Sequence, residues 1–230
     1  MRLTLKFFYD GTKAAELEDK LVQYFEDHSQ VRNKVHLSDT CHCEVACYNR
    51  LIGMDRMQSK SGISNMLFGD AGQILLQRLF PEDQVEYESE DIVSSHADIF
   101  EDHEHIIEIK WSAQRIFRAA DISDSWRLQL MRYMSKHECD VGWMVIVNIL
   151  SRQLTAFKLI MNEDERQAQL IQMIQIRDRI LKAKEEGDPS ELIIWDNECR
   201  YCGYRPSRNR KKQDLDEGCP LYVKPADRKG

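Results

Sequence analysis

The sequence predicts an α/β fold in which a mixed β-sheet is flanked by helices. Short runs rich in β-branched and aromatic residues alternate along the chain with longer segments of helical periodicity. The order of these segments places two antiparallel strand pairs on either side of a helix, without an internal repeat. Hydrophobic residues make up 42% of the 230 residues, which is enough for a proper core.

The first 35 residues form a unit of their own in this prediction. Residues 1–9 have the composition of a strand, and residues 12–28 have apolar side chains at helical spacing, namely Leu17, Leu21 and Phe25. We therefore expect an N-terminal strand-helix appendage over residues 1–35 and one main domain over residues 36–230.

The main domain begins with helical segments. Ser38 or Asp39 is expected to cap a short helix through the first cysteine cluster, because both side chains accept hydrogen bonds from free backbone amides. Residues 53–62 then have the composition of a loop. A helix is expected over residues 66–80, ending at Pro81, since proline cannot continue a helix.

Three strands are expected next, at residues 84–89, 91–100 and 105–111. The last two are separated only by a short polar turn, so they should pair in antiparallel fashion. Within the third strand, side chains alternate between the two faces of the sheet. Glu108 and Lys110 must then share one face, opposite Ile107, Ile109 and Trp111.

The C-terminal half continues with a helix, a hairpin and a second helix. Ser123 or Asp124 should cap a helix that runs to about residue 137. Residues 142–150 and 154–160 then form a hairpin. The following helix opens with acidic residues after residue 161 and carries lysines before Gly187, in agreement with the helix dipole.

The overall charge of -7 argues against a uniformly basic surface for nucleic acids. A local exception runs from Arg200 to Lys212, with six basic residues and no acidic one. Such a run is in general a solvated loop. Apolar stretches of membrane length are absent from the sequence, and residues 1–10 lack the features of a signal peptide, so we expect a cytoplasmic protein without a membrane partner.

Seven cysteines in a cytoplasmic protein indicate metal or redox chemistry rather than disulfides. Cys139 stands alone and is expected to be a small core residue. The other cysteines fall into three groups. The first is a cluster near the N-terminus, Cys41, Cys43 and Cys47; the second is the C-x-x-C pair Cys199 and Cys202; and the third is the single downstream Cys219. Four thiolates from both ends of the domain would suit a zinc or an iron-sulfur site.

The charged residues of the paired strands suggest phosphodiester hydrolysis. Asp98 stands ten residues before Glu108, and Lys110 follows two residues later. Two carboxylates on neighbouring strands can hold Mg2+ or Mn2+, and a lysine beside them can orient a nucleophile or stabilise a negative transition state. The alternative is that these charges lie on the solvated face of an antiparallel sheet.

The next helix adds Gln129 and Tyr133, which lie on one helix face because they are four residues apart. Tyr133 also has a simpler interpretation as a core residue beside Trp126, Leu130 and Met134. The segments "HAD", "EIK" and "QLMRY" together resemble the PD-(D/E)XK nuclease superfamily in its RecB-like branch. The resemblance implies a restriction-endonuclease-like mixed sheet flanked by helices.

The cysteine pattern resembles that of the CRISPR-associated (Cas-four type) iron-sulfur exonuclease family, in which one upstream cysteine joins three after the nuclease core. The resemblance covers about residues 36–220. It implies an iron-sulfur lobe at about residues 36–65 and 190–222 that joins the N- and C-terminal segments. The implied ligands of a 4Fe-4S cluster are Cys43, Cys199, Cys202 and Cys219, with Cys41 and Cys47 as alternatives to Cys43.

The resemblance also implies roles for the other residues. Asp98 and Glu108 would bind Mn2+ or Mg2+, with the Ile109 carbonyl as a further ligand, and Lys110 would serve catalysis. Gln129 and Tyr133 would position the DNA strand. We further expect the basic loop to contact DNA through Arg208, Arg210, Lys211 and Lys212.

The chain departs from the family in three places. The helix before the first strand of the family usually supplies a histidine ligand, and here "GQILLQ" has none. The candidates to replace it in this sequence are Gln73, Gln77, Glu86 and Glu88. Ser95 stands where the family has glycine, and sixteen residues separate Cys202 from Cys219, which is a long insertion.

Two functions follow from these expectations. The first is a metal-dependent exonuclease acting on single-stranded DNA ends, in CRISPR spacer acquisition with its integrase as partner, or in viral or archaeal DNA processing. The second is an iron-sulfur DNA-binding or adaptor module with impaired cleavage, which the missing histidine favours. A purely structural zinc protein would leave the charged strand unexplained.

Overall fold

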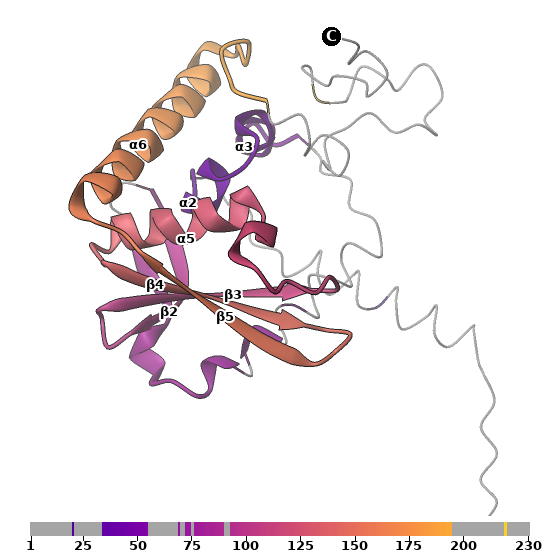
Figure 1. The fold of residues 1–230 in the computed structure, drawn as a ribbon. Coiled ribbons are helices and arrows are strands. Elements are labelled where there is room, and N and C mark those ends of the chain that lie inside the picture. The colour runs from indigo at the N-terminus through magenta and orange to yellow at the C-terminus, as the bar shows by residue number, and fades with distance from the viewer. Residues whose placement is uncertain are drawn as a thin grey trace, which may run out of the picture.

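The computed structural model describes residues 34–54, 72–74, 76–89 and 93–194, together with Lys20, Gly69 and Cys219. Most of residues 1–35, residues 55–68, Cys199, Cys202 and the basic segment 200–212 lie outside these residues. The described part contains a single mixed sheet with the longer helices on one side of it (Figure 1). A helical turn at residues 72–74 and 76–77 contributes Leu76 to the cluster on the opposite face.

Five strands form the sheet in the order β1-β2-β3-β4-β5. They are β1 (Val85–Ser89), β2 (Ser95–Glu101), β3 (His105–Ser112), β4 (Val141–Asn148) and β5 (Gln153–Ile160). Only the β3–β4 pair is parallel, and every other neighbouring pair is antiparallel. The predicted mixed sheet, the antiparallel β2–β3 pair and the β4–β5 hairpin are therefore confirmed.

The helices lie above the sheet in Figure 1. They are α2 (Leu37–Thr40), α3 (Glu44–Leu51), α5 (Asp124–Lys136) and α6 (Glu163–Glu186). Short 3-10 turns also occur at Ala119–Asp121 and at Glu82–Gln84, and the latter contacts β1 and β2. Helix α5 connects the parallel strands β3 and β4, as a parallel pair requires a crossover. Helix α6 packs on α5 and α3.

The helix ends follow from local sequence. The Ser123 hydroxyl accepts a hydrogen bond from the backbone N–H of Trp126, so Ser123 rather than Asp124 caps α5. Asn162 and Glu165 form a capping box at the start of α6, which ends at Gly187 with a left-handed φ of 69°.

The expected cap of the first helix was wrong. The cysteine cluster spans two short helices, and α2 begins after His36 rather than after Ser38 or Asp39. Asp39 contributes from inside the helix, where its Oδ2 accepts from the His36 N–H at 2.8 Å. His36 also forms a parallel bridge with Ser94, so the residue that precedes α2 lies beside the start of β2.

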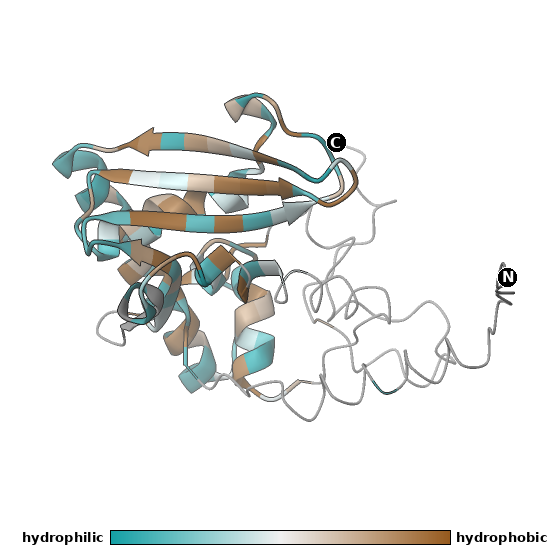
Figure 2. Cartoon of the chain, turned by 90° about the horizontal axis from the view of Figure 1, so that it is seen from below, coloured by the Kyte–Doolittle hydropathy of each residue, from teal (hydrophilic) through white to brown (hydrophobic). Residues whose placement is uncertain are grey.

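The alternating pattern of β3 divides the core into two clusters. Ile106, Leu130 and Met134 belong to the larger cluster beneath the helices. Ile107 and Ile109 belong to a smaller cluster on the opposite face, together with partly buried Trp111. Figure 2 shows the strands from that opposite side, with apolar stretches along them. The face that carries Glu108 is therefore the one covered by α5.

Candidate functional site

Five predicted site residues from three elements line one pocket of about 490 Å³. Strand β2 supplies Asp98, β3 supplies Glu108 and Lys110, and α5 supplies Gln129 and Tyr133. The antiparallel register of β2 and β3 and the crossover through α5 bring these residues together. Ile109 also lines the pocket, as do Gln73, His36 and His96.

Asp98 accepts hydrogen bonds at both oxygens of its carboxylate and at its backbone carbonyl. Its Oδ2 accepts a hydrogen bond from the Ile109 backbone N–H at 2.7 Å, and its Oδ1 accepts from the Gln73 amide at 2.7 Å. The Gln77 amide donates to the backbone carbonyl of Asp98 at 3.0 Å. The carboxylate is therefore fixed in orientation while one side of it faces the pocket.

Glu108 is buried, with only 1% of its side chain exposed, which excludes the solvated face considered from the sequence. Its Oε1 accepts from the Lys110 ammonium at 2.5 Å, while the buried Oε2 has no hydrogen-bond partner among the residues that the structure describes. An unpartnered carboxylate oxygen in a buried site is costly. Burial raises the pKa of Glu108, and the Lys110 charge offsets only part of this rise.

Lys110 remains charged in this environment. Burial acts to lower its pKa, but the neighbouring Glu108 and Asp98 carboxylates outweigh burial, so the Lys110 pKa is raised. With both acids ionised, the three side chains carry two negative charges and one positive charge. The pocket thus offers a net negative charge and one free carboxylate oxygen to a cation.

Tyr133 faces the same group from α5. Burial raises its pKa well above the ordinary value, the Glu108 and Asp98 charges add to the rise, and a hydrogen bond with Gln129 acts in the opposite direction. The hydroxyl is therefore neutral at physiological pH. Tyr133 also packs in the larger core cluster beside Leu130 and Met134, so the simpler interpretation holds as well.

A divalent cation fits the residues present. Asp98 and Glu108 would hold it through oxygen, which is the ligand that Mg2+ and Mn2+ prefer, and the buried Glu108 Oε2 is an oxygen that such a cation would satisfy. Within the described part of the chain, no three His, Cys, Asp or Glu side chains lie close enough together to hold a metal. Among the described residues, a further donor is therefore of another type.

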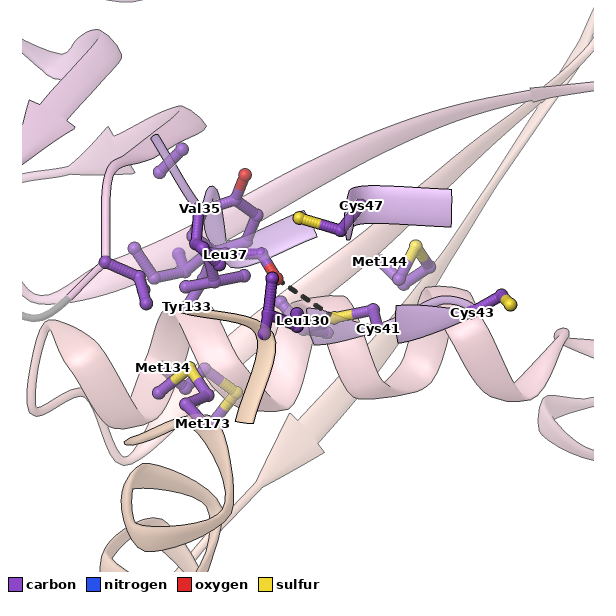
Figure 3. Packing of buried hydrophobic residues seen from close by; sticks show 14 of the residues in the cluster. Val35, Leu37, Cys41, Cys43, Cys47, Leu130, Tyr133, Met134, Met144 and Met173 are labelled. Carbon is purple, nitrogen blue, oxygen red and sulfur yellow. Dashed lines mark hydrogen bonds between the residues drawn. The ribbon is translucent and has the colours of Figure 1, made fainter. Parts of the chain in front are cut away.

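The three N-terminal cysteines do not point to one place (Figure 3). Cys41 and Cys47 point toward the core, whereas the Cys43 sulfur points the opposite way. Cys41 contacts Arg132 at 3.7 Å, and Cys47 contacts Arg50 at 3.5 Å. Burial raises the pKa of Cys41 to about 11 and raises that of Cys47 further, so both are protonated thiols in this environment.

Cys43 lies beside the segment that leads to the C-x-x-C pair. Its Sγ is 3.9 Å from the carbonyl oxygen of Ile193, and the neighbouring Glu44 N–H donates to the same oxygen at 3.2 Å. Cys219 is partly buried and packs against the core cluster that contains the N-terminal cysteines. Cys139 is buried in the core, as the sequence predicted.

Sequence reasoning missed His36 and Ser38 as pocket residues, because no motif marks them and only the bridge between His36 and Ser94 places them there. His96 lies on the exposed rim, with its ring centroid 6.1 Å from that of His36. Of the candidates for the absent histidine, Gln73 and Gln77 both contact Asp98. The side chains of Glu86 and Glu88 lie outside the described part.

No protein-family profile and no curated protein sequence matches the chain. A solved structure titled "Crystal structure of SSO0001" is similar in fold, with a TM-score of 0.61 and 14% sequence identity. The similarity covers 94% of this chain and 100% of that chain. Among the described residues, no helix combines the length and the apolar character needed to cross a membrane.

Proposed function

We propose that the protein is a metal-dependent exonuclease acting on single-stranded DNA ends, within the RecB-like branch of the PD-(D/E)XK superfamily. One observation carries the proposal: Asp98, Glu108 and Lys110 line the same pocket as Gln129 and Tyr133. The mixed sheet packed with helices agrees with the restriction-endonuclease-like fold that this assignment requires.

Each side chain of the pocket would have a separate role in phosphodiester hydrolysis. A bound Mg2+ or Mn2+ would activate water and neutralise charge on the phosphoryl oxygens. Asp98 and Glu108 would hold that cation, and the charged Lys110 beside them would stabilise the negative transition state or orient the nucleophile. The Gln129 amide and the neutral Tyr133 hydroxyl offer hydrogen bonds to the DNA strand.

A cleavage assay on end-labelled single strands tests the proposal. Asp98→Ala and Glu108→Ala should each remove divalent-dependent cleavage, because each substitution deletes half of the carboxylate charge available to the cation. Glu186→Ala is the matched control, since this carboxylate is 56% exposed at the end of α6. Undiminished digestion by the folded Asp98→Ala/Glu108→Ala double variant would refute the nuclease.

An iron-sulfur cluster is part of the proposal. Cys43, Cys199, Cys202 and Cys219 are the proposed ligands of a 4Fe-4S group, and the contact of Cys43 with Ile193 supports Cys43 over Cys41 and Cys47. The cluster lobe and the basic loop, with Arg208, Arg210, Lys211 and Lys212, would add a DNA-contacting surface. CRISPR spacer acquisition is the proposed context, with the integrase of that process as partner.

The second candidate is an iron-sulfur DNA-binding or adaptor module with impaired cleavage. The observation that favours it is the donor set, because among the described residues no third acidic, histidine or cysteine side chain lies close enough to Asp98 and Glu108 to hold a metal with them, although His36 and His96 line the pocket. The same assay separates the candidates. Tight binding of single strands by the wild type without cleavage in Mg2+ or Mn2+ would favour the adaptor.

A further inference from the structure

Gln73 occupies the position in the pocket where a further donor is needed. Its amide nitrogen donates to Asp98 Oδ1 at 2.7 Å, across 25 residues of sequence, and its side chain is one of the pocket walls. Gln73 is thus an uncharged side chain in direct contact with a carboxylate of the candidate cation site.

The local backbone fixes Gln73 in place. The preceding residue, Gly72, packs against the ring of Trp111 so closely that an added Cβ would lie 1.9 Å from a ring carbon. The helical turn that carries Gln73 can therefore approach β3 only because residue 72 lacks a side chain. Gln77, four residues on and 6% exposed, anchors the same turn to the Asp98 backbone.

An amide can serve this site in two ways. Without a cation, the nitrogen end of Gln73 satisfies Asp98, as observed. With a cation bound to the carboxylates, a half-turn about the terminal torsion presents the carbonyl oxygen instead, and this torsion is soft and roughly two-fold. The positive charge favours the oxygen end, because amide nitrogen donates and does not ligate.

We propose that Gln73 completes the cation site as a neutral oxygen donor, so that Asp98, Glu108 and Gln73 form an all-oxygen protein ligand set. This inference rests on the proposed function, since it assumes that the carboxylate pocket binds a divalent cation. Oxygen donors suit Mg2+ and Mn2+, whereas imidazole suits zinc, copper, nickel and iron. Gln73 therefore keeps the site selective for hard cations.

Cation binding by the full chain tests the inference without DNA. The protein is purified anaerobically and titrated calorimetrically with Mg2+ and with Mn2+, and the signal of Asp98→Ala is subtracted as binding elsewhere. Gln73→Ala should weaken binding of both cations by about 10–100-fold, as loss of a metal-site partner does. Gln175→Ala, a substitution at an exposed position of α6, should leave the affinity unchanged.

Pulsed electron paramagnetic resonance of the bound Mn2+ identifies the ligand atoms. The wild type should show no coupling to a directly bound imidazole nitrogen, and Gln73→His should introduce that coupling while keeping the fold. This second variant keeps the test decisive if Gln73→Ala fails to fold. Imidazole coupling in the wild type would instead identify a histidine ligand and overturn the inference.

The outcomes separate the two proposals. If the wild type binds neither cation above the Asp98→Ala baseline, the proposed function fails together with the inference. If the wild type binds cations and the folded Gln73→Ala binds them equally well, only the role of Gln73 is refuted. Weakened binding by Gln73→Ala with new nitrogen coupling in Gln73→His supports both.

Discussion

At the scale of single residues, Glu108 shows a conflict between stability and function. The side chain is buried, one of its oxygens is unpartnered, and burial raises its pKa. A protein selected for stability alone would place a neutral group here, because ionising a buried acid costs free energy. The charge is explained if a cation completes the site.

We expect Glu108→Gln to stabilise the cation-free protein by about 1 kcal/mol, or about 2–4 °C in melting temperature. Below the ordinary carboxyl pKa both folded and unfolded chains hold the proton, so the gain should vanish there. As pH rises, the unfolded chain loses the proton first, and wild-type stability falls until the raised folded pKa is passed. Thermal unfolding across pH measures this difference.

With Mg2+ present, the wild type should become more stable than Glu108→Gln. The cation should raise the melting temperature of the wild type, because a ligand that binds only the folded state stabilises it, and leave Glu108→Gln unaffected. A variant that is less stable than wild type at neutral pH without cation would show that Glu108 is instead satisfied by Lys110 alone.

At the scale of elements, Glu44 joins three parts of the chain. It is 2% exposed, pairs with Arg179 of α6 at 2.5 and 3.1 Å, and accepts from the Ile193 N–H at 3.3 Å. Helix α3, with Cys43 at its N-cap, is thereby held against α6 and against the segment that precedes the C-x-x-C pair.

Glu44→Ala should lower the free energy of unfolding by about 2 kcal/mol, because it removes a buried carboxylate that accepts from the Ile193 N–H and from Arg179, whose side chain is 33% exposed and keeps part of its hydration. Urea denaturation measures the change. Glu191→Ala removes a comparable pair with Lys182 that is exposed on both sides, and it should cost at most about 1 kcal/mol. Equal effects of the two substitutions would contradict the anchoring role of Glu44.

At the scale of the whole molecule, the cluster is expected to join distant parts of the chain. Anaerobically purified protein should be brown and contain iron and labile sulfide, and Cys199→Ser should remove both and lower thermal stability. Cys43→Ser should do the same, whereas Cys41→Ser should retain iron, because the Cys41 sulfur points into the core.

Metal analysis and visible absorption measure the result. Stoichiometric zinc in colourless protein would favour a four-cysteine zinc site. Loss of iron in Cys41→Ser but not in Cys43→Ser would show that Cys41 is the cluster ligand, and it would contradict the prediction that rests on the direction of the Cys41 sulfur.

The strands, the longer helices and the spacing of the charged residues could be predicted from the amino-acid sequence. These features are local or periodic: alternation in β3 places Glu108 and Lys110 on one face, Ser123 caps α5, and Gly187 ends α6. The same periodicity predicts that Gln129 and Tyr133 share a helix face. Local rules do not say which face of the sheet is covered.

Tertiary structure decided the features that depend on distant contacts. It buried Glu108 beneath α5, made His36 the cap of α2, and brought Gln73 to Asp98 across 25 residues. It also turned Cys43 toward Ile193, 150 residues away, while Cys41 and Cys47 point inward. The physical reason is that burial and pairing depend on which segments pack together, and neither spacing nor composition within one segment contains that information.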